Sequence, residues 1–282
     1  MWDEPRSALP RGRYGMRITA ILAVFRMASA DLWRRWMIAI PPALFILVLL
    51  TQLPRVEFIA RLAQDSETQQ KAASEFASLV TLLYGQNLVW GSLLALVLGT
   101  AVLGTHKSRA ALPTVLGRSV SRADVLAARY AANAVPIMIF WLVPALANEM
   151  LAVRIAAPVR VSPVAYVAPL CFHLLLLAMG TWLGAIFSSV PATMAGIFIG
   201  ILFLNLDSAL GSVNDYLRWV GQVTRFFIPP AGRLLEAAAP FSSIAVLGAR
   251  AGLFLQSIMW IAIFLILATM RFEKIDLTAR DD

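Results

Sequence analysis

The sequence predicts an all-α membrane protein with six transmembrane helices, an N-terminal amphipathic interfacial helix, and both termini in the cytoplasm. Hydrophobic residues make up 60% of the 282 residues and charged residues 14%, whereas about 25% of a soluble domain is charged. Several apolar runs approach the roughly 20 residues that a helix needs to cross about 30 Å of hydrocarbon. Lys and Arg are distributed unequally between the segments that join these runs. One membrane bundle therefore fits better than one or two soluble domains.

The N-terminal segment is rich in Arg and has no short apolar core followed by a small-residue cleavage site, so we expect no removable signal peptide. Apolar residues recur along one helical face of residues 14–36. Arg17, Arg26, Arg34 and Arg35 stand where lipid headgroups can reach them. The pattern predicts an amphipathic interfacial helix that leads into the first span. A positively charged anchor without a mechanical role fits it equally well.

Six apolar runs are predicted to span the membrane. They cover residues 36–53, 88–105, 131–153, 164–188, 190–206 and 251–270. The fourth and fifth runs are almost continuous, and together they are too long for one span. Ser188, Ser189 and Pro191 favour a tight turn between them, so residues 164–206 are expected to form a helical hairpin.

The distribution of basic residues predicts the orientation. The N-terminal segment, the segment 107–129 and the tail from Arg271 hold 15 Lys and Arg residues, whereas the segments on the other side hold 9. Because cytoplasmic segments carry the excess of Lys and Arg, both termini are expected inside the cell. On the outside, residues 54–79 are expected to form a surface helix. Residues 207–250 are expected to form either short interfacial helices or an ordered loop.

The inner segment between the second and third spans carries the most informative motif. Ser121 and Asp124 form a Ser-x-x-Asp pattern, which can cap the start of a helix. Before this cap, Leu116 and Val120 offer apolar contacts beside Arg118. Apolar groups among arginines suit docking against a cytoplasmic partner.

This stretch resembles the Leu-Ser-Arg-Pro-Val-Ser-Arg-x-x-x-Leu-x-x-Lys signature of the type-2 ABC transporter permeases. The matching residues are Leu116, Arg118, Val120, Ser121, Arg122 and Leu126, with Arg129 in the basic position. Gly117 and Ser119 depart from the signature, and without the usual Pro at Ser119 the signature does not define the turn there. The order of the other elements, from the interfacial helix to the tail that begins at Met270, is also similar to this family.

The resemblance implies that residues 1–282 form a single permease domain, with a cytoplasmic and interfacial segment at 1–35, a six-span bundle at 36–270 and a cytoplasmic tail at 271–282. Such a permease is the membrane subunit of an ATP-driven ABC exporter. It pairs with a second permease subunit, as a homodimer or a heterodimer, and couples to a separate ATP-binding subunit through the segment between the second and third spans. The implied coupling residues are Leu116, Arg118, Val120, Ser121, Arg122, Asp124 and Arg129.

The same resemblance implies a chain in a bacterial plasma membrane that has no catalytic residues and binds no cofactor, while ATP and Mg²⁺ bind to the partner subunit. A Gly-x-x-x-x-Gly-Lys-Ser/Thr phosphate-binding loop is approached only by Gly99 and Gly104, which Thr105 follows instead of Lys. Two Gly-x-x-x-Gly pairs also occur: Gly180 with Gly184, and Gly196 with Gly200. Small residues at this spacing allow close helix packing, either within the chain, which we favour, or at a dimer face.

Two other functions stay open: an intramembrane lipid-modifying enzyme and a secondary transporter. An enzyme needs reactive polar groups at one depth, and Glu149 and His173 are the clearest ionisable residues within the spans. Interfacial solvation explains Glu149, and hydrogen-bonded packing explains His173, better than a reactive role. With Cys171 as the only cysteine and two histidines, neither a disulfide nor a metal site is expected. The basic residues indicate topology rather than nucleic-acid binding.

Overall fold

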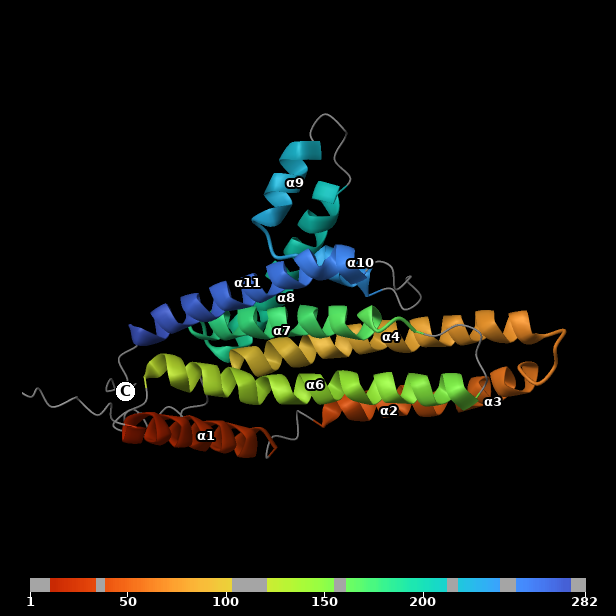
Figure 1. Cartoon of the computed structure of the whole chain (residues 1–282), viewed down its shortest axis with the longest axis horizontal. Helices are drawn as coiled ribbons and strands as arrows, with labels where there is room; N and C mark the ends of the chain where they lie inside the picture. Colours follow the sequence, from red (N-terminus) through yellow and green to blue (C-terminus); the bar gives the residue numbers. More distant parts are fainter. Residues whose placement is uncertain are drawn as a thin grey trace, which may run out of the picture.

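The computed structural model describes residues 11–33, 39–102, 121–154, 161–211, 218–238 and 247–274. Within these ranges the chain forms ten helices and no strand, so the all-α prediction is confirmed. In chain order the helices are α1 (Arg11–Trp33), α2 (Ile40–Thr51), α3 (Leu53–Leu62), α4 (Gln69–Thr100), α6 (Arg122–Arg154), α7 (Val164–Gly184), α8 (Ser189–Gly211), α9 (Arg218–Phe226), α10 (Ala231–Ala237) and α11 (Leu247–Glu273). Most of them run along the long axis of the molecule (Figure 1).

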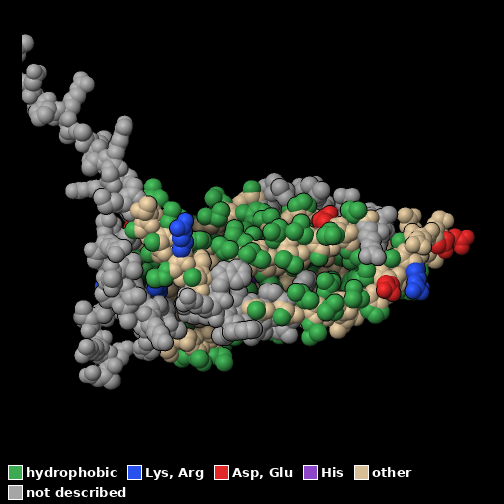
Figure 2. Space-filling view, turned by 90° about the horizontal axis from the view of Figure 1, so that it is seen from below, with side chains coloured by type: hydrophobic (Ala, Val, Ile, Leu, Met, Phe, Trp, Pro, Cys, Tyr) green, Lys and Arg blue, Asp and Glu red, His purple; other side chains and the backbone are tan. Residues whose placement is uncertain are grey.

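Five of the described helices are long and apolar enough to cross a membrane: α4, α6, α7, α8 and α11. The first predicted span, residues 36–53, overlaps α2, which has 12 residues, and residues 34–38 lie outside the description. Figure 2 shows apolar side chains over the middle of the molecule and charged side chains at its tapered end. The chain is thus a helical, membrane-like protein, and the count of six spans stays a prediction.

The polar segment after α2 differs from its prediction. The sequence predicts one surface helix over residues 54–79, but α3 ends at Leu62 and the chain from Gln69 onward already belongs to α4. No Pro interrupts α4, so the helix continues across the predicted boundary. With 32 residues, α4 is about 48 Å long and exceeds the roughly 30 Å of hydrocarbon. α3 packs against α4, and Arg55 Nη2 lies 2.9 Å from Glu75 Oε2.

The predicted helical hairpin is divided into two helices beside its predicted turn residues. α7 ends at Gly184 and α8 begins at Ser189. α7 is the central helix: it contacts α4, α6, α8, α10 and α11, and Figure 1 shows it between α4 and α11. Small residues such as Ala165, Ala168 and Ala178 are fully buried on it, which lets its neighbours approach closely. The C-terminal part of α8 instead projects from the bundle, with α9 beside it (Figure 1).

Glycines set the distance between α4 and α7. A Cβ atom added at Gly99 would lie 2.5 Å from the Leu177 carbonyl oxygen, and one added at Gly184 would lie 2.7 Å from the Thr100 carbonyl oxygen. A Cβ atom at Gly180 would lie 3.2 Å from Gly99 Cα. Backbone meets backbone at these points, so no side chain can move aside. The structure therefore places Gly180 and Gly184 in a contact within the chain.

The second glycine pair lies on α8 and is packed less tightly. A Cβ atom added at Gly196 would lie 2.8 Å from Leu96 Cδ2, on α4. A Cβ atom added at Gly200 would lie 3.5 Å from Leu176 Cδ2, which is an ordinary contact distance. Gly200 therefore has room for a side chain, whereas Gly196 has little.

Gly99→Ala is expected to destabilise the fold, because the added methyl group collides with the backbone of α7. Overpacking of this kind costs about 1–3 kcal/mol. Gly85→Ala, on the same helix, is the matched control: its Cβ atom would have no neighbour within 4 Å, so this change should be neutral or slightly stabilising. Thermal unfolding of the detergent-purified proteins measures the difference. Equal unfolding midpoints would contradict the backbone contact.

Candidate functional site

The start of α6 carries a reciprocal cap. The Ser121 hydroxyl donates to Asp124 Oδ2 at 2.8 Å and accepts the Asp124 N–H at 3.1 Å. The Ser121 N–H donates to the same carboxylate at 3.1 Å. This is the capping arrangement that the Ser-x-x-Asp spacing predicts, and the carboxylate also lies at the positive end of the helix dipole. The cap therefore stabilises the first turn of α6, which begins at Arg122.

Arg122 connects this cap to the end of α11. Its Nη1 donates to the carbonyl oxygens of Phe272 at 2.6 Å and Glu273 at 3.0 Å. The guanidinium carbon also lies 5.5 Å from the centroid of the Phe272 ring, within the range of a cation–π contact. The last carbonyls of a helix have no partner inside it and carry its negative dipole end. A cation in this place therefore holds two helix ends together.

Arg129 makes the corresponding connection to α4. This residue is 5% exposed, and its Nη1 donates at 3.2 Å to the carbonyl oxygen of Val102, just beyond the end of α4. We call Ser121, Arg122, Asp124 and Arg129 the α6 junction, since they tie the start of α6 to the ends of α4 and α11. The other predicted coupling residues lie outside the described part of the chain: Leu116, Arg118 and Val120.

α1 packs beside the start of α6 (Figure 1). Val24 is buried in an apolar cluster that includes residues of α6 and α11. Arg26, by contrast, is exposed. The side chain of Arg17 is not among those described, and Arg34 and Arg35 lie outside the described ranges. The interfacial role of this helix stays a prediction.

His173, midway along α7, is completely buried. Trp141 Nε1–H donates to His173 Nδ1 at 2.6 Å, and His173 Nε2 lies 3.2 Å from both the Leu88 carbonyl oxygen and the Ser92 hydroxyl. Because Nδ1 accepts a hydrogen bond, a neutral ring carries its proton on Nε2. In this arrangement the ring cannot take a proton from Ser92, as a nucleophile and its base would require. Gly91 makes room for the ring, since a Cβ atom there would lie 2.5 Å from His173 Cε1.

Two further polar candidates lie within the predicted spans. Glu149 is half-buried near the end of α6, and Cys171 on α7 is a half-buried free thiol. Across the described ranges, no three residues of the types His, Cys, Asp and Glu come together in a way that could hold a metal ion.

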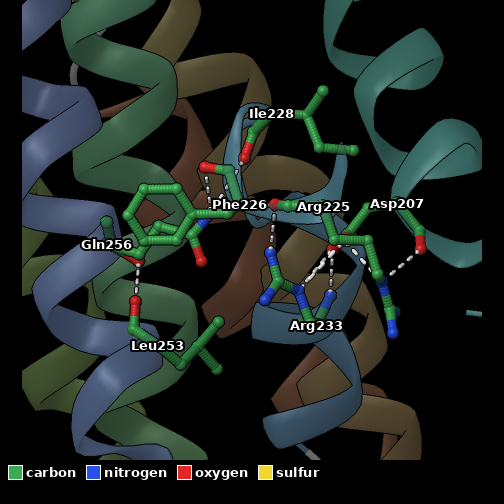
Figure 3. Close-up of polar contacts among 8 residues, drawn as sticks. Asp207, Arg225, Phe226, Ile228, Arg233, Leu253 and Gln256 are labelled. Carbon is green, nitrogen blue, oxygen red and sulfur yellow. Dashed lines mark hydrogen bonds and ion pairs between the residues drawn. The ribbon is translucent and has the colours of Figure 1, made fainter. Parts of the chain in front are cut away.

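A buried ion cluster joins the ends of α8, α9 and α10 (Figure 3). Asp207 is 0% exposed. Its Oδ1 accepts from Arg225 Nε at 3.3 Å and from Arg233 Nε at 3.0 Å. Its Oδ2 accepts the Arg233 N–H at 2.8 Å. Two arginines and a backbone amide thus compensate the one buried carboxylate, as a charge in this position requires.

Gln256 of α11 completes this arrangement. Its Nε2 lies 3.0 Å from the carbonyl oxygens of Arg225 and Phe226 and 3.1 Å from that of Ile228. Arg233 Nη2 also donates to the Arg225 carbonyl oxygen, at 3.0 Å. These donors satisfy carbonyls at the end of α9 that have no partner within the helix. We call Asp207, Arg225, Arg233 and Gln256 the Asp207 cluster.

Sequence reasoning missed the Asp207 cluster. It counted Arg225 and Arg233 only as charges that bear on topology. One signal was present in the sequence: Gln256 lies inside an apolar run, and a polar residue inside a span usually has a partner.

The chain matches no model of a known protein family and no curated protein. We therefore describe the class of this protein from its fold and its candidate site. It is a helical, membrane-like protein whose long apolar helices are connected by two sets of charged and polar residues, the α6 junction and the Asp207 cluster.

Asp207→Asn is expected to destabilise the fold, because it removes the charge that pairs with both arginines and leaves polar groups poorly satisfied. The expected loss in the free energy of unfolding is about 1–3 kcal/mol. Glu67→Gln, a change of the same chemistry at an exposed residue, should cost less than about 0.5 kcal/mol. Thermal unfolding in detergent compares the two. A loss no larger for Asp207→Asn than for the control would mean that the cluster is not structural.

Proposed function

We propose that the chain is the transmembrane permease subunit of an ATP-driven exporter. It pairs with a second permease subunit and couples to a separate ATP-binding subunit through the segment between the second and third spans. The observation that carries this proposal is the α6 junction. A segment that resembles the coupling helix of type-2 ABC permeases leads into α6 at Ser121, and there the ends of three long apolar helices converge.

The contacts of the junction suit the transmission of force. Arg122 and Arg129 make charge-assisted hydrogen bonds, which are stronger and more directional than neutral ones. Each reaches backbone carbonyls rather than a flexible side chain. A displacement of Ser121 by a partner would therefore move α6 together with the ends of α4 and α11. A loop without these contacts would absorb the same displacement.

The proposal includes a topology and a location. Both termini face the cytoplasm, in keeping with 15 basic residues on that side against 9 on the other. α1 then lies on the cytoplasmic side, beside the junction. ATP and Mg²⁺ bind to the partner subunit, and the membrane is the bacterial plasma membrane.

The alternatives are an intramembrane lipid-modifying enzyme and a secondary transporter. For the enzyme, Ser92 and His173 would be a candidate reactive pair in the described part of the chain, but the Trp141 hydrogen bond turns the protonated nitrogen of the ring toward the serine. For the secondary transporter, transport that continues without ATP would be the distinguishing result. We therefore favour the permease.

Arg118→Ala and Arg122→Ala are expected to separate docking from coupling when the chain is coexpressed with a candidate ATP-binding subunit. Loss of Arg118 should weaken co-purification of the two subunits, since this residue belongs to the predicted docking surface. Loss of Arg122 should leave co-purification intact but lower the stimulation of ATP hydrolysis about tenfold, because hydrogen bonds to a charged group contribute about 1.5–3 kcal/mol.

Arg61→Ala serves as the control, since it removes an exposed arginine from α3. Unchanged co-purification in the Arg122 variant also shows that the variant is folded. If the two test variants bind the partner and stimulate hydrolysis as the unmodified chain does, the segment has no coupling role.

A further inference from the structure

An apolar groove of about 400 Å³ lies between α4, α7, α8 and α10. This volume is within the range of small-molecule and cofactor sites, about 300–1,000 Å³. Its lining is apolar except for Ser92. The Ser92 hydroxyl donates at 2.7 Å to the Leu88 carbonyl oxygen of its own helix, so it adds little polarity to the wall. The groove therefore suits a hydrocarbon chain rather than a polar solute.

The groove opens sideways, away from the core. Val89 on α4 and Ile201 on α8 lie along it and are 58% and 56% exposed. Both helices are long and apolar enough to cross a membrane, so the opening faces lipid when they do. Along α4 the lining runs from Leu88 to Leu96, a rise of about 12 Å. That length is close to the roughly 15 Å of hydrocarbon in one leaflet.

The lining at one end of the groove and the Asp207 cluster lie on the same two helices, α8 and α10. On α8 the lining residues Gly200 and Leu204 form a stripe along one helix face, and Asp207 follows on the same face one turn later. On α10, Leu235 lines the groove and Arg233 belongs to the cluster. A molecule lying in the groove would therefore have its end beside the two arginines.

The Asp207 cluster has more positive than negative charge, and some of its hydrogen-bond donors have no acceptor within the described part of the chain. Both of its ion pairs are made with the one carboxylate of Asp207, and the other acid of α10, Glu236, is exposed. Arg225 binds Asp207 through Nε, which leaves both of its terminal nitrogens without an acceptor in the described part of the chain. The side chains of Arg225 and Arg233 are 20% and 26% exposed. They can therefore be reached from outside the fold.

We propose that this groove binds an anionic phospholipid, with one acyl chain along α8 and the phosphate on Arg225 and Arg233. The apolar lining, the lateral opening and the charge at one end together match an amphiphile with an anionic head. Arginine is well suited to such a phosphate because its planar guanidinium offers paired donors. The inference needs only that the chain lies in a membrane, and it does not rest on the proposed export function.

Gly200→Leu tests the acyl site, because the position faces the groove and its Cβ atom has ordinary room. The isobutyl group should fill the groove without disturbing the fold. Gly252→Leu, on α11, is the matched control, since a Cβ atom there has no neighbour within 4 Å. Native mass spectrometry of the full-length protein in detergent counts bound lipid after addition of phosphatidylglycerol or phosphatidylcholine.

The unmodified chain and Gly252→Leu should retain phosphatidylglycerol about tenfold more strongly than phosphatidylcholine, a difference that one charged contact can supply. Gly200→Leu should lose this retention, and glycerol phosphate without acyl chains should not bind. Equal retention of both lipids, or unchanged retention by Gly200→Leu, would overturn the proposal. So would a Gly200→Leu protein that binds lipid normally but no longer forms dimers, because the groove would then be an interface between two copies.

Arg225→Gln tests the headgroup site separately. It should reduce the preference for phosphatidylglycerol while leaving weak, unselective lipid binding in the groove. The unfolding midpoint of this variant, measured in parallel, establishes that the cluster has kept its fold. An unchanged preference in a folded Arg225→Gln protein would show that the arginine does not contact the headgroup.

Discussion

The close contact between α4 and α7 is the constraint on which the rest of the structure depends. Gly99 and Gly180 bring the two backbones together, and Gly184 continues the contact beside Thr100. Hydrocarbon surrounding a spanning helix is as apolar as its side chains, so close packing must replace the hydrophobic effect in holding helices together. Since α7 also contacts α6, α8, α10 and α11, its distance from α4 decides where these helices lie. The space for the His173 ring depends on the same approach, at Gly91.

Charged residues then fix the helix ends that this packing brings together. The α6 junction joins the ends of α4 and α11 to the start of α6, and the Asp207 cluster joins α8, α9 and α10 to the first part of α11. α11 takes part in both, through Gln256 and Phe272. These residues are about 24 Å apart on one helix, so a rigid element connects the two sets. In the proposed exporter, a displacement at the junction would reach the Asp207 cluster through α11.

The sequence predicted the features that depend on local pattern. Apolar length indicated the five long apolar helices, Ser188 and Pro191 indicated the break between α7 and α8, and the spacing of Ser121 and Asp124 indicated a cap. The extension of α4 was missed, because polar residues before Leu88 do not end a helix when no Pro interrupts it.

The long-range contacts could not be predicted in the same way. Arg122 binds backbone carbonyls 150 and 151 residues away, and every residue has a carbonyl, so nothing in the sequence marks these two. Asp207 and Arg233 are 26 residues apart and lie on different helices. Their pairing depends on how α8 and α10 pack, which a single sequence does not specify.

The central claim is that the α6 junction faces the cytoplasm, where an ATP-binding subunit can reach it. The most direct measurement is the location of a reporter fused to the C-terminus, since Arg122 binds the carbonyl of Glu273 and the junction and the tail therefore share one side. We predict a fluorescent C-terminal green fluorescent protein fusion and an inactive alkaline phosphatase fusion, the pattern of a cytoplasmic end. The opposite pattern would contradict both the six-span topology and the coupling role of the junction.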